Sequence, residues 1–174
     1  MPADTEILLR QIYQMSNNRN FDRFLEIGDD DFSFSIPGLS RFRVNTYRQR
    51  GSLAAVIRVI AFELPDPGIL NIPEDVMSVS DFTKGMVLVT GPAGSGKSTT
   101  LASLVDIMNR KYPYHIITLE DPIEYLHRHQ CSMVNQREIG SDSNDYAQAL
   151  RAALREDPDV ILVGEMRDLE TIST

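Results

Sequence analysis

The stretch Met86-Val-Leu-Val-Thr-Gly-Pro-Ala-Gly-Ser-Gly-Lys-Ser-Thr99 decides the fold of this chain. It opens on an almost wholly apolar run and passes into a glycine-rich turn that fits G-x-x-x-x-G-K-[ST]. Short apolar runs of this kind are typical of strands in parallel sheets that are covered on both faces. We therefore predict a strand over residues 86–90, followed by a helix over 96–110 whose inward stripe is Leu101, Leu104, Val105 and Met108.

The residue types of this turn predict a phosphate-binding loop. Glycines allow the backbone angles that turn N–H groups inward, and the following helix adds its N-terminus. We expect Lys97 to reach the β- and γ-phosphates of ATP, Ser98 to bind Mg²⁺ and Thr99 to bond the α-phosphate. A glycine-rich turn that binds nothing is the alternative, but the strand before and the helix after argue against it. The predicted nucleotide-binding residues are Gly91, Ala93, Gly94, Ser95, Gly96, Lys97, Ser98 and Thr99.

The rest of residues 74–174 alternates strand and helix patterns. Residues 115–119 and 160–163 predict buried strands, and 131–135 is a possible short strand. Residues 143–155 predict a helix, with another starting near Asp168. This alternation predicts an α/β fold with a parallel sheet and right-handed crossovers. The inward residues expected on the helix at 143–155 are Tyr146, Ala149, Leu150, Ala153 and Leu154.

Residues 1–62 read as a small α+β domain. Two helices are predicted, at 4–15 and 21–27, followed by strands at 31–36, 41–47 and 53–60. Pro65, Pro67, Gly68 and Pro73 mark residues 63–73 as a linker, and a short helix is expected over 74–82. The inward face expected for the first helix is Ile7, Leu8, Ile12 and Met15.

Carboxylates follow two of the predicted core strands, at the strand ends where open α/β sheets bind ligands. Glu165 follows the run 160–163, and we predict that it serves the metal. Glu120, Asp121 and Glu124 follow the run 115–119, where a catalytic loop and an ordinary exposed loop are equally compatible with the residues alone. Asp157 and Asp159 precede their strand and read as turn residues.

Composition limits the classes of binding partner and the cellular compartment that we expect. The net charge of −8 argues against broad binding to nucleic acid. Cys131 is the only cysteine, so no internal disulfide or cysteine-based zinc site can form, and a reducing cytoplasmic setting follows. No apolar run is long enough to be a transmembrane segment, so membrane association is expected only through partners. His115, His127 and His129 show no metal-ligand pattern.

Two long motifs resemble the secretion and type IV pilus ATPases. The run ITLEDPIEY at residues 117–125 resembles their Asp box, and residues 149–172 resemble their Walker B region. The sequences VNQRE at 134–138 and GEMRD at 164–168 are similar to the corresponding sequences of the twitching-motility subgroup. DFSF at 31–34 and RFRVN at 41–45 resemble the PAS-like domain that precedes the motor domain in this family.

This resemblance implies a partial RecA-like P-loop ATPase core preceded by a partial PAS-like domain. It implies that Glu124 is the general base, that Glu120 and Asp121 support the metal and the water, and that Glu165 is the Walker B glutamate. Arginines of the first domain act as fingers in a hexameric ring of this family. Arg41, Arg43 and Arg58 are the candidates here, although outward strand arginines would look the same. Interface or sheet-packing charges are expected at Arg151, Arg155 and Arg167.

The resemblance further implies ATP hydrolysis that retracts a type IV pilus, with a homo-hexamer docked on an inner-membrane platform protein. An assembly ATPase for pilus extension or type II secretion is the near alternative. A nucleotide-binding, non-catalytic fragment or structural ring subunit is the alternative of another class, and a DNA-translocating motor is more distant. Ala93 stands where the family usually carries threonine, with little loss expected because the backbone binds phosphate. We expect the His box and the remaining motor sheet to follow Thr174.

Overall fold

A computed structural model describes residues 2–60, 64, 68–166 and 169–174. The chain divides into two compact units, residues 1–61 and 62–174, and each is considered by itself. Part of the predicted linker at 63–73 lies outside the described residues, so the linker stays a prediction.

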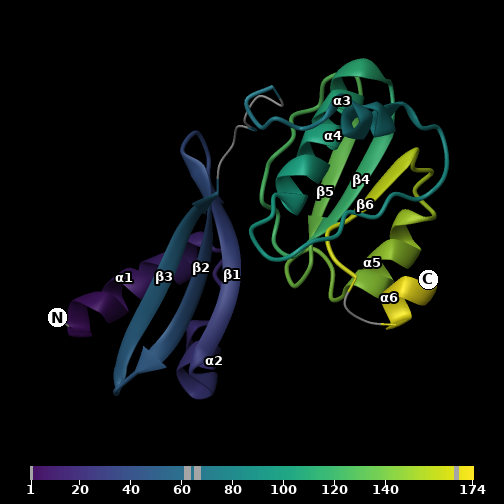
Figure 1. Cartoon of the computed structure of the whole chain (residues 1–174). Coiled ribbons are helices and arrows are strands. Elements are labelled where there is room, and N and C mark those ends of the chain that lie inside the picture. The colour runs from purple at the N-terminus through teal and green to yellow at the C-terminus, as the bar shows by residue number, and fades with distance from the viewer. Residues whose placement is uncertain (1, 61–63, 65–67, 167–168) are drawn as a thin grey trace. The chain divides into compact units, whose positions relative to one another are not determined.

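The first unit is a three-stranded antiparallel sheet with helices on one side (Figure 1). Helices α1 (Pro2–Met15) and α2 (Phe21–Ile27) precede strands β1 (Asp29–Ile36), β2 (Ser40–Gln49) and β3 (Ser52–Ile60). Asn20 caps α2 by accepting from the Arg23 N–H at 3.1 Å, and Gly28 ends it at φ +93°. Phe32 and Phe34 face the core from β1. These elements confirm the predicted helix–helix–strand order.

The inward face predicted for the first helix is wrong at three of its four positions, and of the four residues only Ile12 packs against the core. Leu9 and Tyr13 are buried, whereas Ile7, Leu8 and Met15 are each more than half exposed. Leu9 and Tyr13 lie four residues apart and therefore share one helix face. The Tyr13 ring packs edge-on or stacked against three phenylalanines of the core, at centroid distances of 4.8–5.8 Å, and this cluster sets the rotation of the helix: Phe21, Phe24 and Phe32.

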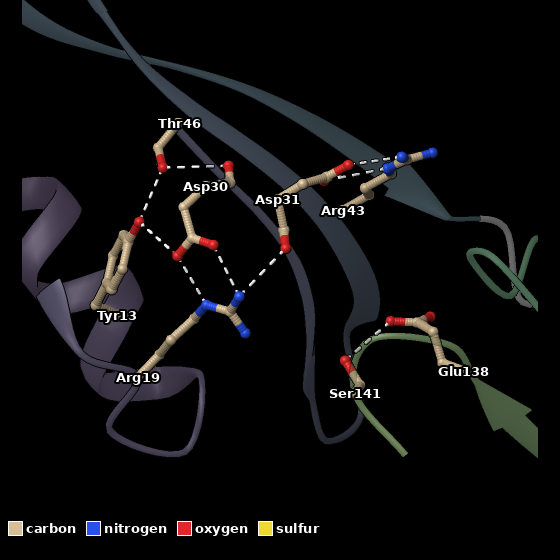
Figure 2. Close-up of polar contacts among 8 residues, drawn as sticks. All are labelled: Tyr13, Arg19, Asp30, Asp31, Arg43, Thr46, Glu138 and Ser141. Atoms are coloured by element: carbon tan, nitrogen blue, oxygen red, sulfur yellow. Dashed lines mark hydrogen bonds and ion pairs between the residues drawn. The ribbon is translucent and has the colours of Figure 1, made fainter. Parts of the chain in front are cut away.

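A polar network ties α1 and the following turn to the sheet (Figure 2). The Tyr13 hydroxyl donates to Asp30 at 3.0 Å and lies 2.8 Å from the Thr46 hydroxyl. The Arg19 guanidinium donates two 2.8 Å bonds to the Asp30 carboxylate. Burial acts to raise the pKa of Asp30, but Arg19 and Tyr13 outweigh burial and the pKa is lowered. Burial raises the pKa of Tyr13 to about 12, so its proton stays in the network.

The lowered pKa of Asp30 predicts a pH-dependent contribution to stability. A carboxyl whose pKa is lower in the folded state stabilises the fold above its unfolded pKa of about 3.9, and this contribution is lost as the pH falls through the folded value. We expect Asp30→Asn to lower the free energy of unfolding at pH 7 by about 1–2 kcal/mol. The difference from the parent should shrink below about pH 4, measured by urea unfolding at several pH values. Asp29→Asn, an exposed neighbour on β1, is the control, and an equal loss in both variants would contradict the prediction.

The second unit is built on a parallel three-stranded sheet with the order β5-β4-β6 (Figure 1). Its strands are β4 (His115–Glu120), β5 (Met133–Glu138) and β6 (Val160–Val163). The helices are α3 (Glu74–Met77), α4 (Lys97–Lys111), α5 (Tyr146–Ala153) and α6 (Leu169–Ser173), with a 3-10 turn, η1, at Ser78–Asp81. This arrangement confirms the predicted α/β class and the parallel sheet.

Strand β4 is buried on both faces. On one face Ile116 packs with Val105 of α4 and Val134 of β5. On the other face Ile117 and Leu119 pack with α5 through Tyr146, Ala149 and Ala153. Alternate residues of β4 thus enter two separate clusters, which explains why apolar residues occupy both odd and even positions of this strand.

The strand predicted at residues 86–90 does not form. Met86, Val87 and Leu88 are 80%, 46% and 60% exposed, and no described strand pairs with them. A strand requires a ladder partner, and β4, β5 and β6 pair only among themselves. Leu154, expected to face inward, is 56% exposed because α5 ends at Ala153. Asp168, where a helix was expected to start, lies outside the described residues, and α6 begins at Leu169.

Candidate functional site

The phosphate loop leads directly into α4, as its sequence predicts. Gly91, Gly94 and Gly96 all adopt positive φ, at +151°, +75° and +91°. Lys97 is the first residue of α4, and its ammonium donates to the carbonyls of Gly91 and Pro92 at 3.0 and 2.9 Å. The cation therefore lies over the loop backbone, where a phosphate would be bound.

Gly91 is the glycine of the loop with the least room. A Cβ built at this position would lie 2.8 Å from the Ser95 hydroxyl oxygen, at a φ that other residues rarely adopt. We expect Gly91→Ala to weaken Mg-ATP binding by at least about tenfold, because alanine is strained at this φ and the Ser95 hydroxyl must also move away from the methyl group. Calorimetric titration checks this. Gly38→Ala, also at positive φ but with open space around it, is the control; parent-like affinity in Gly91→Ala would contradict the prediction.

One cavity of about 180 Å³ gathers side chains from distant parts of the sequence. Its predicted members come from the start of α4 and from the ends of β4 and β6. Sequence reasoning missed others that also line it, among them Thr118, Tyr125, His127 and Tyr146. The volume suits phosphate oxygens and a hydrated cation rather than a whole nucleotide. The predicted residues that the structure brings together here are Lys97, Ser98, Glu120, Asp121, Glu124 and Glu165.

Glu120 ends β4 and is held from two sides. The Thr118 hydroxyl donates to its carboxylate at 2.5 Å and the Gln136 amide donates to the same oxygen at 3.1 Å. Burial raises the pKa of Glu120, and these two donors partly offset that effect. Thr118 and Gln136 are direct partners in the β4–β5 register, which is why both reach Glu120.

Glu124 is exposed and follows the cis Asp121–Pro122 peptide bond in the loop after β4. Next to it, the Tyr125 hydroxyl lies 3.2 Å from the Thr99 hydroxyl of α4. This contact joins the loop that carries Glu124 to the residue predicted to bond the α-phosphate. Burial lowers the pKa of His127, which lines the same cavity.

Gly164 brings the end of β6 close to β4. Its N–H donates to the Leu119 carbonyl at 2.7 Å, and a Cβ at this position would lie 3.1 Å from that oxygen. Glu165 follows directly and lines the cavity. Asp159 lies at the opposite end of β6, where its carboxylate accepts from the His115 N–H at 2.7 Å.

The donor set fits Mg²⁺ held mainly through water. Among the described residues, no three carboxylate, histidine or cysteine side chains converge to hold an ion directly. Mg²⁺ usually keeps several waters and takes one or two protein oxygens together with substrate phosphates. Ser98 and Glu165 line the same cavity and would provide these one or two protein oxygens, and the surrounding carboxylates provide negative charge.

The arginine-finger candidates lie in the first unit, on the sheet face opposite the core. Arg41 donates to the Ser33 hydroxyl at 2.6 Å, and Arg43 pairs with Asp31 at 2.7 Å (Figure 2). Arg58 lies opposite Arg43 in the β2–β3 register and is exposed.

The remaining predicted arginines differ in their surroundings. Arg151 pairs with Glu170 at 2.8 Å and so links α5 to α6. Arg155 is exposed just beyond α5, and Arg167 lies outside the described residues.

The far end of the loop after β4 is tied to α4 through Asn109. This side chain is fully buried; it donates to the Arg128 carbonyl at 2.7 Å and accepts from the Gln130 N–H at 3.1 Å. The backbone N–H of the exposed Cys131 donates to the Asn109 carbonyl at 2.9 Å. In the described ranges of the chain, none of the helices has the length and apolar character needed to cross a bilayer.

Comparison with known proteins places these features in a family. The type II/IV secretion system protein family matches residues 26–174. A type IV pilus retraction ATPase of Pseudomonas aeruginosa is 50% identical over 161 residues, which cover 92% of this chain and 47% of that protein. A twitching motility protein of Neisseria gonorrhoeae is 48% identical over 163 residues, covering 94% of this chain and 41% of the relative.

A solved structure agrees with the sequence comparison. The crystal structure of the pilus retraction motor PilT with bound ADP superposes with a TM-score of 0.84 at 55% identity. The superposition covers 87% of this chain and 44% of that one, so the chain spans about half the length of the relatives it matches. The sequence motifs, the parallel sheet and the comparisons agree. The chain therefore belongs to the type II/IV secretion system protein family.

Proposed function

We propose that the protein carrying this chain is a Mg²⁺-dependent ATPase whose hydrolysis drives type IV pilus retraction. The observation that carries the proposal is the cavity that joins the phosphate-loop residues Lys97 and Ser98 to Glu124 and Glu165. The similarity to proteins described as a pilus retraction ATPase and a twitching motility protein supports retraction as the output.

The residues divide the chemistry among them. Lys97 and the N–H groups of the phosphate loop would bind the β- and γ-phosphates and neutralise charge as it builds on the leaving oxygens. Glu124 would take a proton from the attacking water as the water oxygen bonds to the γ-phosphorus. The bond from the γ-phosphorus to the β-γ bridging oxygen breaks at the same time, which yields ADP and phosphate. Ser98 and Glu165 would hold Mg²⁺, which supplies electrostatic stabilisation of the phosphates. Glu120 and Asp121 would order the water around the metal.

We further propose a homo-hexamer in which first-unit arginines reach the nucleotide of a neighbouring subunit. Arg58 is the strongest of the three candidates, because its side chain forms no ion pair within the described residues, whereas Arg43 is already paired with Asp31. An arginine held by a carboxylate must release it before it can neutralise a phosphate. The proposed location is the cytoplasm, at the inner membrane through a platform protein, with no nucleic acid as partner.

An experiment in cells separates retraction from the alternative of pilus extension or secretion. In cells that lack the gene for this protein, we expect surface pili to persist while twitching stops, because extension continues without retraction. The parent gene should restore twitching, and a gene carrying Lys97→Ala should not. Loss of surface pili in the deletion strain would instead favour an extension ATPase, and intact pili with normal twitching would overturn the proposal.

A further inference from the structure

The β4–β5 loop, residues 121–132, runs beside β5 without forming a ladder with it. Hydrogen bonds hold it there, each between a side chain of one segment and a backbone group of the other. The Ile123 N–H donates to the Glu138 carboxylate at 3.2 Å, and Glu138 in turn accepts from Ser141 at 3.4 Å (Figure 2). Further along, the His129 ring accepts from the Val134 N–H at 3.0 Å. Two odd-numbered positions of the loop, Ile123 and His129, are thus bonded to β5.

Gln136 is the central point of this attachment. Its amide oxygen accepts from the His127 N–H at 2.7 Å, and its amide nitrogen donates to the Tyr125 carbonyl at 2.8 Å. The same nitrogen donates to the Glu120 carboxylate at 3.1 Å. One side chain therefore satisfies two backbone groups of the loop and one carboxylate of the candidate site, which uses both amide hydrogens and the oxygen.

These bonds fix the backbone on both sides of Glu124. Ile123 is anchored by Glu138, and Tyr125 is anchored by Gln136. Glu124 lies between the two anchors and lines the cavity with Lys97, whereas Gln136 is not among the residues that line it. Gln136 can therefore influence a bound nucleotide only through the cavity residues that it holds, which are Glu120 and the loop residues 124–127.

We propose that Gln136 is a positioning residue, which holds the Glu124 loop and the Glu120 carboxylate in register with the phosphate loop. The inference rests on the proposed ATPase function. Catalysis by a base depends on its placement, and a misplacement of about 1 Å can cost about 100-fold in rate, whereas nucleotide affinity depends on Lys97 and the phosphate loop. A residue that only stabilised the fold would affect binding and hydrolysis together. A positioning residue affects hydrolysis alone.

The test compares Gln136→Met with Gln130→Met in the protein that carries this chain. Methionine keeps the length of the side chain but removes all three bonds, and Gln130 is an exposed glutamine of the same loop whose amide makes only a 3.5 Å contact with Asp106. For Gln136→Met we expect Mg-ATP affinity within about threefold of the parent and kcat lowered about 10- to 100-fold. Amide hydrogen exchange at His127 should accelerate at least about tenfold, because its N–H loses its acceptor, the Gln136 amide oxygen. The control should match the parent in all three measurements.

Unchanged exchange and unchanged kcat in Gln136→Met would overturn the inference, and so would equal losses of affinity and kcat. If this variant does not fold, Gln136→Glu replaces it, since it keeps the acceptor for the His127 N–H and loses the donor to the Tyr125 carbonyl and to Glu120. Exchange at His127 should then match the parent, and an unchanged kcat, or equal losses of affinity and kcat, would overturn the inference. Failure of the proposed function is a separate result. If the parent binds Mg-ATP without hydrolysing it, the exchange measurement on Gln136→Met alone decides the inference, and unchanged exchange at His127 overturns it.

Discussion

Lys97→Ala should reduce Mg-ATP affinity by about 100-fold or more, which corresponds to about 3 kcal/mol. The Lys97 ammonium lies over the loop and donates to the carbonyls of Gly91 and Pro92. Anionic phosphate oxygens are stronger acceptors than these neutral carbonyls, so the ammonium contributes more in the bound state than in the free one. Isothermal titration calorimetry of Mg-ATP into parent and variant measures the difference directly.

The matched control for this measurement is Lys84→Ala. Lys84 is an exposed lysine a short distance before the same loop. The two substitutions change the net charge equally, so a general electrostatic effect would weaken binding in both. Circular dichroism should show both variants folded. A folded Lys97→Ala protein with the affinity of the parent would contradict the assignment of residues 91–98 as the phosphate site.

Glu124→Gln should lower the rate of ATP hydrolysis by about 10²–10⁴-fold, the range expected for loss of a general base. Glutamine has nearly the same shape and can keep its place between the anchored residues Ile123 and Tyr125, but it cannot take a proton from water. Mg-ATP affinity should stay within about threefold of the parent, since Glu124 acts on the attacking water and not on the nucleotide. The measurement is a single-turnover hydrolysis assay together with a binding titration.

Two comparisons make the hydrolysis assay decisive. Glu74→Gln, at the start of α3, removes an exposed carboxylate that does not line the cavity and should hydrolyse ATP like the parent. Lys97→Ala should lose binding as well as hydrolysis. If Glu124→Gln hydrolyses ATP at the parent rate, another carboxylate of the cavity is the base; if the parent itself only binds ATP, the non-catalytic alternative stands.

Local patterns predicted the parts of the fold that depend on local physics. The phosphate loop needs glycine at positive φ and a lysine at the start of a helix, and both requirements appear in the sequence. The two-sided burial of β4 appears as apolar residues at both odd and even positions ahead of Glu120, namely Ile116, Ile117 and Leu119. Carboxylates placed after parallel strands were expected to meet at one sheet edge, and Glu120 and Glu165 do line one cavity.

Features that depend on partners could not be predicted in this way. Residues 86–90 have the composition of a buried strand, but a strand also needs a neighbour, and none of the described strands supplies one. The contacts of Gln136 depend on its register opposite Thr118 and on the path of the loop after β4. Neither can be predicted from the spacing of the motifs. Likewise, Ile7, Leu8 and Met15 match helical periodicity as well as Leu9 and Tyr13 do, and only the aromatic cluster selects between the two faces.

The single cysteine makes the Glu124 loop open to direct observation. Cys131 is exposed, and its backbone is held by Asn109 at the far end of the loop, so a probe on its thiol would project into solvent without displacing a core residue. Because the chain has no other cysteine, a maleimide dye or spin label attaches at one defined place without prior mutagenesis. Fluorescence or electron paramagnetic resonance of such a label on this chain would report whether the loop moves when Mg-ATP is added.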